Sequence, residues 1–323
     1  MKPVLLVTGA SRGIGAATAL LAARQGWAVA VNYSQNATAA ETIVQQIKAE
    51  GGQAVSIQAD VGDEAQIKHL FAQVDAQLGR LTGFVNNAGV LDVAVRVDEL
   101  SWERLERMMR INVIGSMVCA REAIRRMSTQ LGGPGGSIVN LSSVAARLGG
   151  AGQYVDYAAS KGAIESFTVG LARELAADGI RVNAVAPGPV DTEMAKLVHS
   201  PEIRRDYHDA IPLERYGSCE EIANAVGFLC LPEAGYVNGQ VLAVDGDGEG
   251  VAVAQRNEAA AVARTESLPD LAADRGREAV GVERRNGRYV GRRQAHLQRA
   301  ARGSGRVAGG VAHVRDQRVV VAV

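Results

Sequence analysis

Cysteine is scarce in this sequence, with only Cys119, Cys219 and Cys230 in a chain of 323 residues. They form no C-x-x-C pair and no spacing typical of metal ligands, so neither a disulfide framework nor a metal site is predicted. Long apolar runs are also missing, and none approaches the roughly 20 residues that cross a bilayer. The chain does not begin with a secretory-signal pattern. We therefore expect reduced thiols and a cytoplasmic location.

Net charge is zero, but this zero is the sum of two unlike segments. Residues 251–323 contain 14 arginines, no lysine and seven acids, a net charge of +7 that leaves −7 for residues 1–250. The basic segment has one aromatic residue and no sustained apolar face. We predict one folded domain at 1–249 and an irregular, disordered extension at 250–323. A tail that binds nucleic acid or an acidic partner, and a reading-frame artefact, are the alternatives.

Short apolar runs alternate with helical patterns through the rest of the chain. Strands are predicted at 4–7, 27–32, 54–58, 81–85, 137–141, 180–186 and 239–244. Helices are predicted from 16 to 26 and at 37–50, 63–78, 102–127, 156–177 and 218–230, whereas 194–211 is predicted to be irregular. This alternation indicates an α/β fold with a parallel sheet and right-handed crossovers.

A glycine-rich segment, TGASRGIG at 8–15, lies between the first strand and the first helix. Glycine lets the backbone approach a pyrophosphate, and the N-terminus of the helix offers unpaired N–H groups and a positive dipole. The spacing is Gly-x-x-x-Gly-x-Gly instead of Gly-x-Gly-x-x-Gly. A tight turn without a ligand is the alternative, but the flanking strand and helix favour a dinucleotide cofactor.

The end of the second strand bears on which cofactor is bound. An acid there usually meets a free ribose 2′-hydroxyl, yet residues 32–36 contain none. Arg12, in the glycine-rich segment, offers a guanidinium that can meet a 2′-phosphate. Both features favour NADP(H), with NAD(H) possible. A solvated loop charge is the other interpretation of Arg12.

Tyr157 and Lys161 are the strongest candidates for chemistry. They are four residues apart in a predicted helix, so they share one face. An ammonium beside a phenol favours the phenolate, and we therefore predict a lowered pKa for Tyr157 and a role in proton transfer. A surface contact is the alternative. Ser142 and Ser143 follow the strand at 137–141, where ligands of open α/β sheets bind, although turn-forming serines are common there.

Taken together, these residues resemble the short-chain dehydrogenase/reductase family over roughly residues 3–246. The likeness is greatest to bacterial sugar dehydrogenases and 3-oxoacyl-carrier-protein reductases. Its motifs occur in family order: TGxxxGxG at 8–15, Asp60-Val61, NNAG at 86–89, Asn112, Ser143, Tyr157-x-x-x-Lys161, and Pro187-Gly188 with Thr192.

The resemblance implies a single-domain, doubly wound (Rossmann) fold with a seven-stranded parallel sheet. It implies an NADP(H)-preferring oxidoreductase that transfers a hydride between nicotinamide and an alcohol or carbonyl substrate. The implied catalytic residues are Tyr157 as general acid/base, Lys161, Ser143 on the substrate oxygen, and Asn112 in a water relay. The implied cofactor-binding residues are Gly9, Ser11, Arg12, Gly13, Ile14, Gly15, Ser34, Asp60, Val61, Asn87, Ala88, Gly89, Tyr157, Lys161, Pro187, Gly188, Val190 and Thr192. Such enzymes are usually tetramers or dimers joined partly through the helices that carry Asn112 and Tyr157.

Three features depart from the family pattern. Tyr154 precedes Tyr157, but only Tyr157 has a lysine four residues on, so Tyr154 is a candidate substrate-facing ring. Ser142 remains an alternative to Ser143. Asp178 stands where carrier-protein reductases often have a basic residue. Substrate choice is expected to lie in 191–217, and a non-catalytic nucleotide sensor on the same fold is the alternative function.

Overall fold

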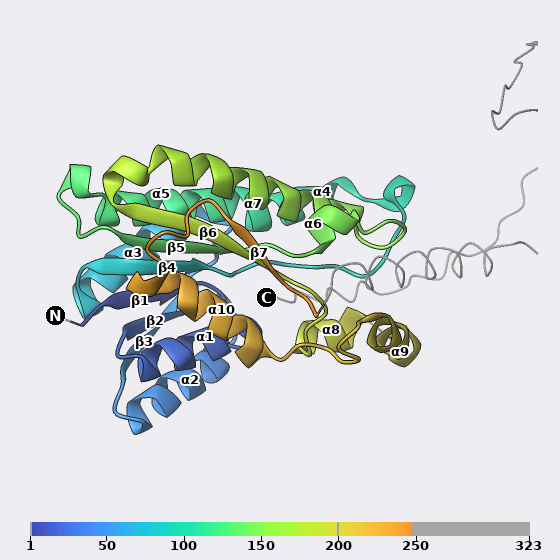
Figure 1. Ribbon diagram of the computed structural model, residues 1–323, viewed down its shortest axis with the longest axis horizontal. Helices are drawn as coiled ribbons and strands as arrows, with labels where there is room; N and C mark the ends of the chain where they lie inside the picture. The colour runs from blue at the N-terminus through green and yellow to red at the C-terminus, as the bar shows by residue number, and fades with distance from the viewer. Residues whose placement is uncertain (1, 199, 247–323) are drawn as a thin grey trace, which may run out of the picture. The chain divides into compact units, whose positions relative to one another are not determined.

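The computed structural model describes residues 2–198 and 200–246. Within them, seven strands form one entirely parallel sheet in the order β3-β2-β1-β4-β5-β6-β7 (Figure 1). The strands are β1 (Val4–Val7), β2 (Ala28–Tyr33), β3 (Gln53–Gln58), β4 (Leu81–Asn86), β5 (Gly136–Leu141), β6 (Ile180–Pro187) and β7 (Val241–Val244). The predicted seven-stranded doubly wound sheet is confirmed. The predictions for 250–323 lie outside the described residues.

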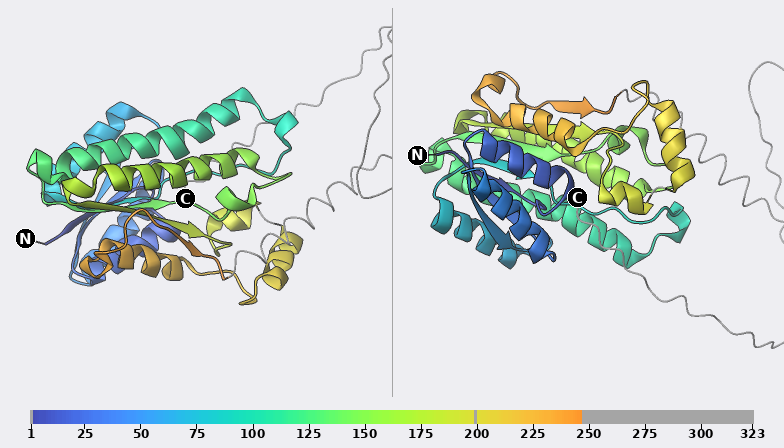
Figure 2. Two further views of the ribbon diagram at one scale, coloured as in Figure 1. Left: turned by 45° about the horizontal axis from the view of Figure 1, so that its top comes forward. Right: turned by 90° about the horizontal axis from the view of Figure 1, so that it is seen from below.

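Helices cover both faces of this sheet (Figure 2). One face carries α1 (Gly13–Arg24), α2 (Ala37–Ala49) and α10 (Cys219–Cys230). The other face carries α3 (Glu64–Leu78), α5 (Ser116–Met127) and α7 (Val155–Glu174). The remaining α-helices are α4 (Trp102–Met109), α6 (Ala145–Leu148), α8 (Glu193–Val198) and α9 (Pro201–Ala210), and short 3₁₀ turns are η1 (Val97–Glu99), η3 (Thr129–Leu131), η4 (Ala176–Asp178) and η5 (Pro232–Ala234). No helix in the described part of the chain is long and apolar enough to span a membrane.

Burial on both faces explains why β1 is an uninterrupted apolar run. Leu5 and Val7 pack under α1, α2 and α10, whereas Val4 and Leu6 pack under α3, α5 and α7. All four side chains are buried. Because successive side chains of a strand point to opposite faces, a strand that is covered on both sides needs apolar residues at every position.

The order of strands also fixes where a ligand can bind. β1 lies between β2 and β4, so the chain moves outward in one direction from β1 to β3 and then restarts on the other side at β4. When the segments that follow two neighbouring parallel strands lead away from each other, a crevice forms at the carboxyl ends of these strands. The TGASRGIG turn lies at this crevice.

The predicted helix at 102–127 consists of α4, a π-helical turn η2 (Arg110–Gly115), and α5. Gly115 explains part of this geometry, because a Cβ added there would lie 2.2 Å from the Val61 carbonyl oxygen. Only glycine allows the helix to approach the loop after β3 this closely. π turns are rare and frequently occur at functional sites, and this one contains Asn112.

The prediction of irregular structure at 194–211 is wrong, because this segment forms α8 and α9 at the carboxyl end of the sheet (Figure 1). Ser200 caps α9 by accepting a hydrogen bond from the Ile203 N–H at 3.3 Å, and Pro201 occupies its first turn. Tyr207 in α9 and Ile211 directly after it are the buried residues of this segment. The other side of α9 is mostly charged, and this masks the apolar pattern in the sequence.

Candidate active site

The TGASRGIG turn has a backbone that favours glycine at two positions. Gly9 and Gly13 have φ angles of +63° and +58°, where residues with a Cβ are strained. At Gly15 the reason is contact, since a Cβ would lie 2.6 Å from both the Gly9 carbonyl oxygen and the Asn87 side chain. The turn therefore brings bare backbone to the N-terminus of α1, which is the arrangement that binds phosphate groups.

Thr8 and Asn87 hold this turn against the end of β4. The Thr8 hydroxyl oxygen accepts hydrogen bonds from the Asn87 and Ala88 N–H groups at 3.0 and 3.1 Å. The Asn87 amide donates to the Thr8 and Gly9 carbonyl oxygens at 2.7 and 3.2 Å. Asn87 is fully buried and lies behind the turn, so it supports the nucleotide cleft without lining it.

A cleft extends from the turn across the carboxyl ends of β2 and β3. Its lining includes eight of the predicted cofactor residues: Gly9, Ser11, Arg12, Ser34, Asp60, Val61, Ala88 and Gly89. Seven more line the pocket that adjoins it beside α7: Ile14, Tyr157, Lys161, Pro187, Gly188, Val190 and Thr192. The predicted site residues therefore come together at the carboxyl edge of one sheet.

The end of β2 carries a structural amide where an acid would mark an NAD site. Asn32 is buried, its side-chain oxygen accepts the Gly9 N–H at 3.2 Å, and its amide donates to the Ile57 and Ala59 carbonyl oxygens. It thereby joins the glycine turn to β3. Asp60 is the one acidic residue that lines the cleft in the described chain, and it follows β3, not β2.

Arg12 lies on the rim of the cleft. Its guanidinium forms an ion pair with Glu193 at 3.1 Å, which links the glycine turn to the start of α8. Both side chains are partly exposed, so the pair itself contributes little to stability. The ion pair keeps the Arg12 guanidinium at the part of the cleft that Ser34 and Asn36 also line.

Tyr157 and Lys161 project from α7 into the adjoining pocket and are 8% and 3% exposed. The Lys161 ammonium donates a hydrogen bond to the Leu141 carbonyl oxygen at 2.7 Å, at the end of β5. Its nitrogen lies 5.5 Å from the centre of the Tyr157 ring. The pair is therefore inside the protein, at the edge of the sheet where the glycine turn lies, and is not a surface contact.

The pKa prediction for Tyr157 is wrong in direction. Burial raises the pKa of the phenol above its usual value, and a hydrogen bond with Ser143 opposes this only in part. Burial also lowers the pKa of Lys161 to about 8. Helical spacing alone could not show how strongly burial desolvates the phenol. The result is a phenol that keeps its proton at neutral pH.

The two serines after β5 have different surroundings. Ser142 is buried and donates a hydrogen bond to Glu165 at 2.9 Å. Ser143 shares a hydrogen bond with the Tyr157 side chain, and its oxygen also accepts the Ala145 N–H at 3.2 Å. Both line the pocket. Ser143 is thus the serine placed beside the candidate proton donor.

Comparison with known proteins agrees with this geometry. The family model described as enoyl-(acyl carrier protein) reductase matches residues 9–247. The uncharacterized oxidoreductase YgfF of Escherichia coli is 48% identical over 243 residues, covering 75% of this chain and 98% of that protein. The 3-oxoacyl-(acyl-carrier-protein) reductase FabG of Staphylococcus aureus is 40% identical over 248 residues, covering 76% and 98%. A short-chain dehydrogenase from Burkholderia cenocepacia, solved in complex with NADP, matches with a TM-score of 0.70 at 35% identity, covering 76% and 98%.

The chain belongs to the short-chain dehydrogenase/reductase family. It is an NAD(P)-dependent oxidoreductase.

In this short-chain dehydrogenase/reductase, Asn112 is buried beside the cleft. Its side-chain oxygen accepts the Val90 N–H at 2.7 Å, and its amide donates to the Val90 carbonyl oxygen at 2.9 Å and to Ser160 at 3.1 Å. The side chain therefore joins the segment after β4 to α7. A water relay through this residue stays a prediction.

The segment 191–217, where substrate choice is expected to lie, supplies part of this pocket from two helices, α8 and α9, that were not predicted. Met194 and Ala195 from α8 and Tyr207 from α9 line the same pocket as Tyr157. The signals that could have found α9 are the Ser200-Pro201 start and the four-residue spacing of Ile203, Tyr207 and Ile211.

A buried ion pair beside Tyr157 was also missed. Asp156 is fully buried and accepts two hydrogen bonds from Arg104, at 2.7 and 3.1 Å, while Arg104 also donates to the Val93 carbonyl oxygen at 2.7 Å. Bidentate pairs of this kind fix orientation as well as distance. This one ties the first turn of α7 to α4 and so holds the residue next to Tyr157 in place.

Proposed function

We propose that this enzyme is an NADP(H)-preferring oxidoreductase that acts on alcohol and carbonyl groups, with Tyr157 as the general acid/base. One observation carries the proposal. Tyr157, Ser143 and Lys161 line a single pocket beside the glycine turn, with a hydrogen bond between Tyr157 and Ser143. The alternative, a non-catalytic nucleotide sensor, does not require these three polar side chains in one pocket.

The residues present fit a dinucleotide. The turn at 8–15 offers glycine backbone at a helix N-terminus, the cleft beside it is lined by Asp60 and Val61, and Val190 and Thr192 line the neighbouring pocket. When bound, the nicotinamide supplies the hydride in reduction and accepts it in oxidation.

Tyr157 handles the proton. Because burial raises its pKa, the phenol is protonated at neutral pH and is ready to donate to a carbonyl oxygen that gains negative charge. The Ser143 hydroxyl is placed to donate a second hydrogen bond to that oxygen. Lys161, whose pKa burial lowers to about 8, then returns a proton toward Tyr157. These states favour the reductive direction.

The preference for NADP(H) rests on the end of β2 and on Arg12. The cleft there lacks a carboxylate from β2 to accept a hydrogen bond from a free 2′-hydroxyl, and Arg12, Ser34 and Asn36 line it instead. A guanidinium and two neutral polar side chains suit a 2′-phosphate.

A panel of ketones, aldehydes and keto esters, followed by the loss of NADPH absorbance, tests this function. We expect reduction of at least one carbonyl class, faster with NADPH than with NADH. Tyr157→Phe protein that binds NADPH but does not turn over separates the acid/base role from cofactor binding. If Tyr157→Phe keeps wild-type turnover, the role given to this phenol is incorrect.

We further propose a cytoplasmic homo-oligomer, a dimer or tetramer. Ile114 is 57% exposed and Met117 is also exposed, both on the helix that carries Asn112. The thiols of all three cysteines are free. Sedimentation velocity tests the assembly, and Ile114→Glu should shift it toward smaller species.

The proposed catalytic domain is 1–249. A chain that ends at residue 249 should therefore retain NADPH-dependent turnover. Loss of turnover in a well-folded truncated protein would assign a role in catalysis to 250–323.

A further inference from the structure

The pocket beside Tyr157 contains a second set of polar atoms besides those assigned to the reacting carbonyl. The Tyr154 and Tyr207 hydroxyl oxygens lie 3.3 Å apart, and both residues line the pocket. Tyr154 stands at the start of α7, and its ring meets the Tyr157 ring edge to face, with centres 6.0 Å apart. The pair therefore lies close to the proton donor and belongs to the same cavity.

The rest of the lining is almost free of charge. Lys161 is the one charged side chain among the described lining residues, and its ammonium is directed to the Leu141 carbonyl oxygen. The other walls are largely apolar, with Leu91, Met194 and Val190 among them. Since a carboxylate or phosphate inside such walls would lack a cation, the cavity suits a neutral compound.

Tyr207 is held in its position by α9. It is 1% exposed, and its ring packs edge to face on Tyr216, with centres 6.3 Å apart. Arg204 lies over the Tyr216 ring at 4.7 Å and donates a hydrogen bond to Asp191 at 2.9 Å. Asp191 adjoins Thr192, which lines the pocket. This series of contacts places the Tyr207 hydroxyl beside Tyr154 before any substrate arrives.

The contact between the two hydroxyls is easily replaced. A distance of 3.3 Å is long for a hydrogen bond between oxygens, which are usually about 2.5–3.0 Å apart. An acceptor oxygen on a ligand can therefore replace this contact by accepting a hydrogen bond from one of these hydroxyls. Two phenol groups beside the reacting centre suit a substrate that carries a second oxygen.

We propose that Tyr154 and Tyr207 are specificity-determining residues that receive a second acceptor oxygen of a neutral carbonyl substrate. This inference rests on the proposed function, since it takes Tyr157 and Ser143 to hold the reacting carbonyl. The preferred substrates are then ketones with an ester or similar uncharged oxygen group near the ketone, in preference to plain ketones of the same length.

Two probe compounds separate this idea from simple fit. Ethyl 3-oxobutanoate and 2-heptanone have chains of equal length, and only the first carries ester oxygens. Tyr154→Phe and Tyr207→Phe each remove one hydroxyl and keep the ring. We expect each to lower the ratio of kcat/KM for the ester to kcat/KM for 2-heptanone about tenfold, the effect of one lost hydrogen bond of about 1.4 kcal/mol. Using the ratio cancels the intrinsic reactivity of the keto ester.

Tyr216→Phe is the matched control. It removes a hydroxyl from the same aromatic cluster, but Tyr216 does not line the pocket. This variant should leave the ratio unchanged. If Tyr154→Phe and Tyr207→Phe lower both substrates equally, or only lower the melting temperature, the pair merely packs α9 against α7 and the inference is overturned.

A binding measurement keeps this test separate from the proposed function. Calorimetric titration of both compounds into NADPH-loaded Tyr157→Phe protein gives the preference for the ester as a ratio of Kd values, without turnover. A tenfold loss of ester preference in the Tyr207→Phe, Tyr157→Phe double variant supports the inference even if no carbonyl is reduced. An unchanged ratio refutes it even if the enzyme turns over ketones freely.

Discussion

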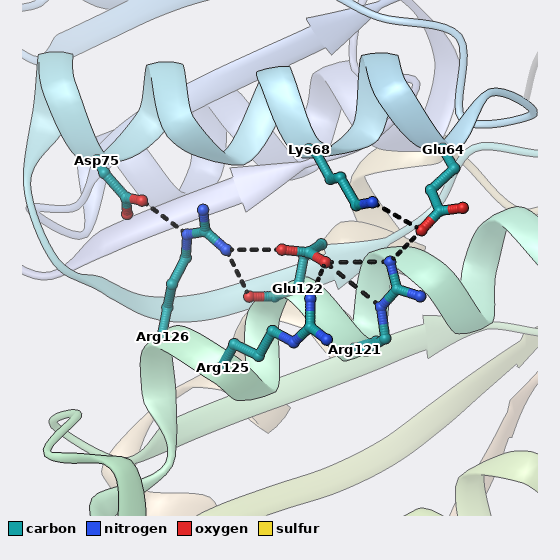
Figure 3. Close-up of polar contacts among 7 residues, drawn as sticks. All are labelled: Glu64, Lys68, Asp75, Arg121, Glu122, Arg125 and Arg126. Carbon is teal, nitrogen blue, oxygen red and sulfur yellow. Dashed lines mark hydrogen bonds and ion pairs between the residues drawn. The ribbon is translucent and has the colours of Figure 1, made fainter.

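Two buried charged groups in this protein have opposite surroundings. Glu122 on α5 is 5% exposed and has three arginines around it, with ion-pair distances of 3.2 Å to Arg121, 2.8 Å to Arg125 and 3.1 Å to Arg126 (Figure 3). Lys161 is 3% exposed and has a carbonyl oxygen as its partner, with no carboxylate within ion-pair distance in the described chain. One charge is compensated several times over, and the other is not.

The network around Glu122 joins two helices. Arg121 also pairs with Glu64 at 2.8 Å, and Arg126 pairs with Asp75 at 2.7 Å, so α5 is tied to α3 at both ends of the cluster (Figure 3). Burial opposes ionisation of Glu122, but hydrogen bonds from Arg126 and Arg121 outweigh it and hold its pKa below the usual value. This region resists changes in protonation.

The titratable groups of the Tyr157–Lys161 region lack such compensation. Burial lowers the pKa of Lys161 to about 8 and raises that of Tyr157, and no charged side chain among the described residues opposes either shift. The comparison teaches that burial alone does not mark a functional site. What marks it is a buried titratable group without a compensating charge, in a pocket large enough for a ligand.

The largest expected effect is on turnover. Tyr157→Phe keeps the ring and the burial but removes the proton donor, so kcat should fall about a thousandfold, as general acids typically contribute. The Kd for NADPH, measured by NADPH fluorescence, should change less than twofold. Glu122→Ala, by contrast, should leave kcat of the folded enzyme unchanged. Equal losses of kcat in the two variants would show that the two regions do not differ in their contribution to catalysis.

The next largest effect is on stability. Glu122→Ala leaves three clustered cations without their central carboxylate, and we expect the free energy of unfolding in urea to fall by about 3 kcal/mol. Glu103→Ala on α4 removes an exposed carboxylate and serves as the control, with a change below about 0.5 kcal/mol. Because the pKa of Glu122 is lowered by folding, its contribution is present above its unfolded pKa and should disappear as pH falls through the folded value.

Lys161 should affect stability with the opposite sign, because its buried charge destabilises the folded protein at neutral pH, whereas that of Glu122 stabilises it. Its pKa is lowered from 10.5 to about 8 by folding, so at pH 7 the folded state holds a costly buried charge. Between about pH 8 and 10.5 the folded state releases the proton and the unfolded state keeps it, so stability rises with pH. Lys161→Met should therefore exceed wild type in stability at pH 7 by on the order of 2 kcal/mol, with a gap that narrows by pH 10. A gap that is constant with pH would show that Lys161 is not desolvated as described.

The smallest effect concerns the ion pair between Arg12 and Glu193. This pair is exposed to solvent, unlike the charges in the two regions compared above. Arg12→Ala should raise the Kd of NADPH about tenfold more than that of NADH, through loss of a contact to the 2′-phosphate. Glu193→Gln removes this ion pair and should tighten NADPH binding by no more than about threefold, because exposed ion pairs are weak. Equal effects of Arg12→Ala on both cofactors would remove the case for NADP(H) preference.

Much of the architecture could be predicted from local patterns. The apolar run at Val4–Val7, the amphipathic helix ending at Leu78 and the capped start at Ser218 appear in the structure as predicted, within one or two residues. α8 and α9 were not predicted, because the charged residues of α9 mask the four-residue spacing of its few apolar positions. Tyr207, Asp156 and Arg104 were missed for a different reason, since their partners come from other elements.

By itself, the sequence determined the order of strands and helices, the glycine turn and the spacing that places Tyr157 and Lys161 on one face of α7, because each depends on the chemistry of neighbouring residues. Only the tertiary structure decided the protonation states, since desolvation depends on which elements close over a group, and here it reversed the expected pKa shift of Tyr157. The same holds for the hydroxyl pair of Tyr154 and Tyr207, which are 53 residues apart and meet only when α9 folds over the pocket.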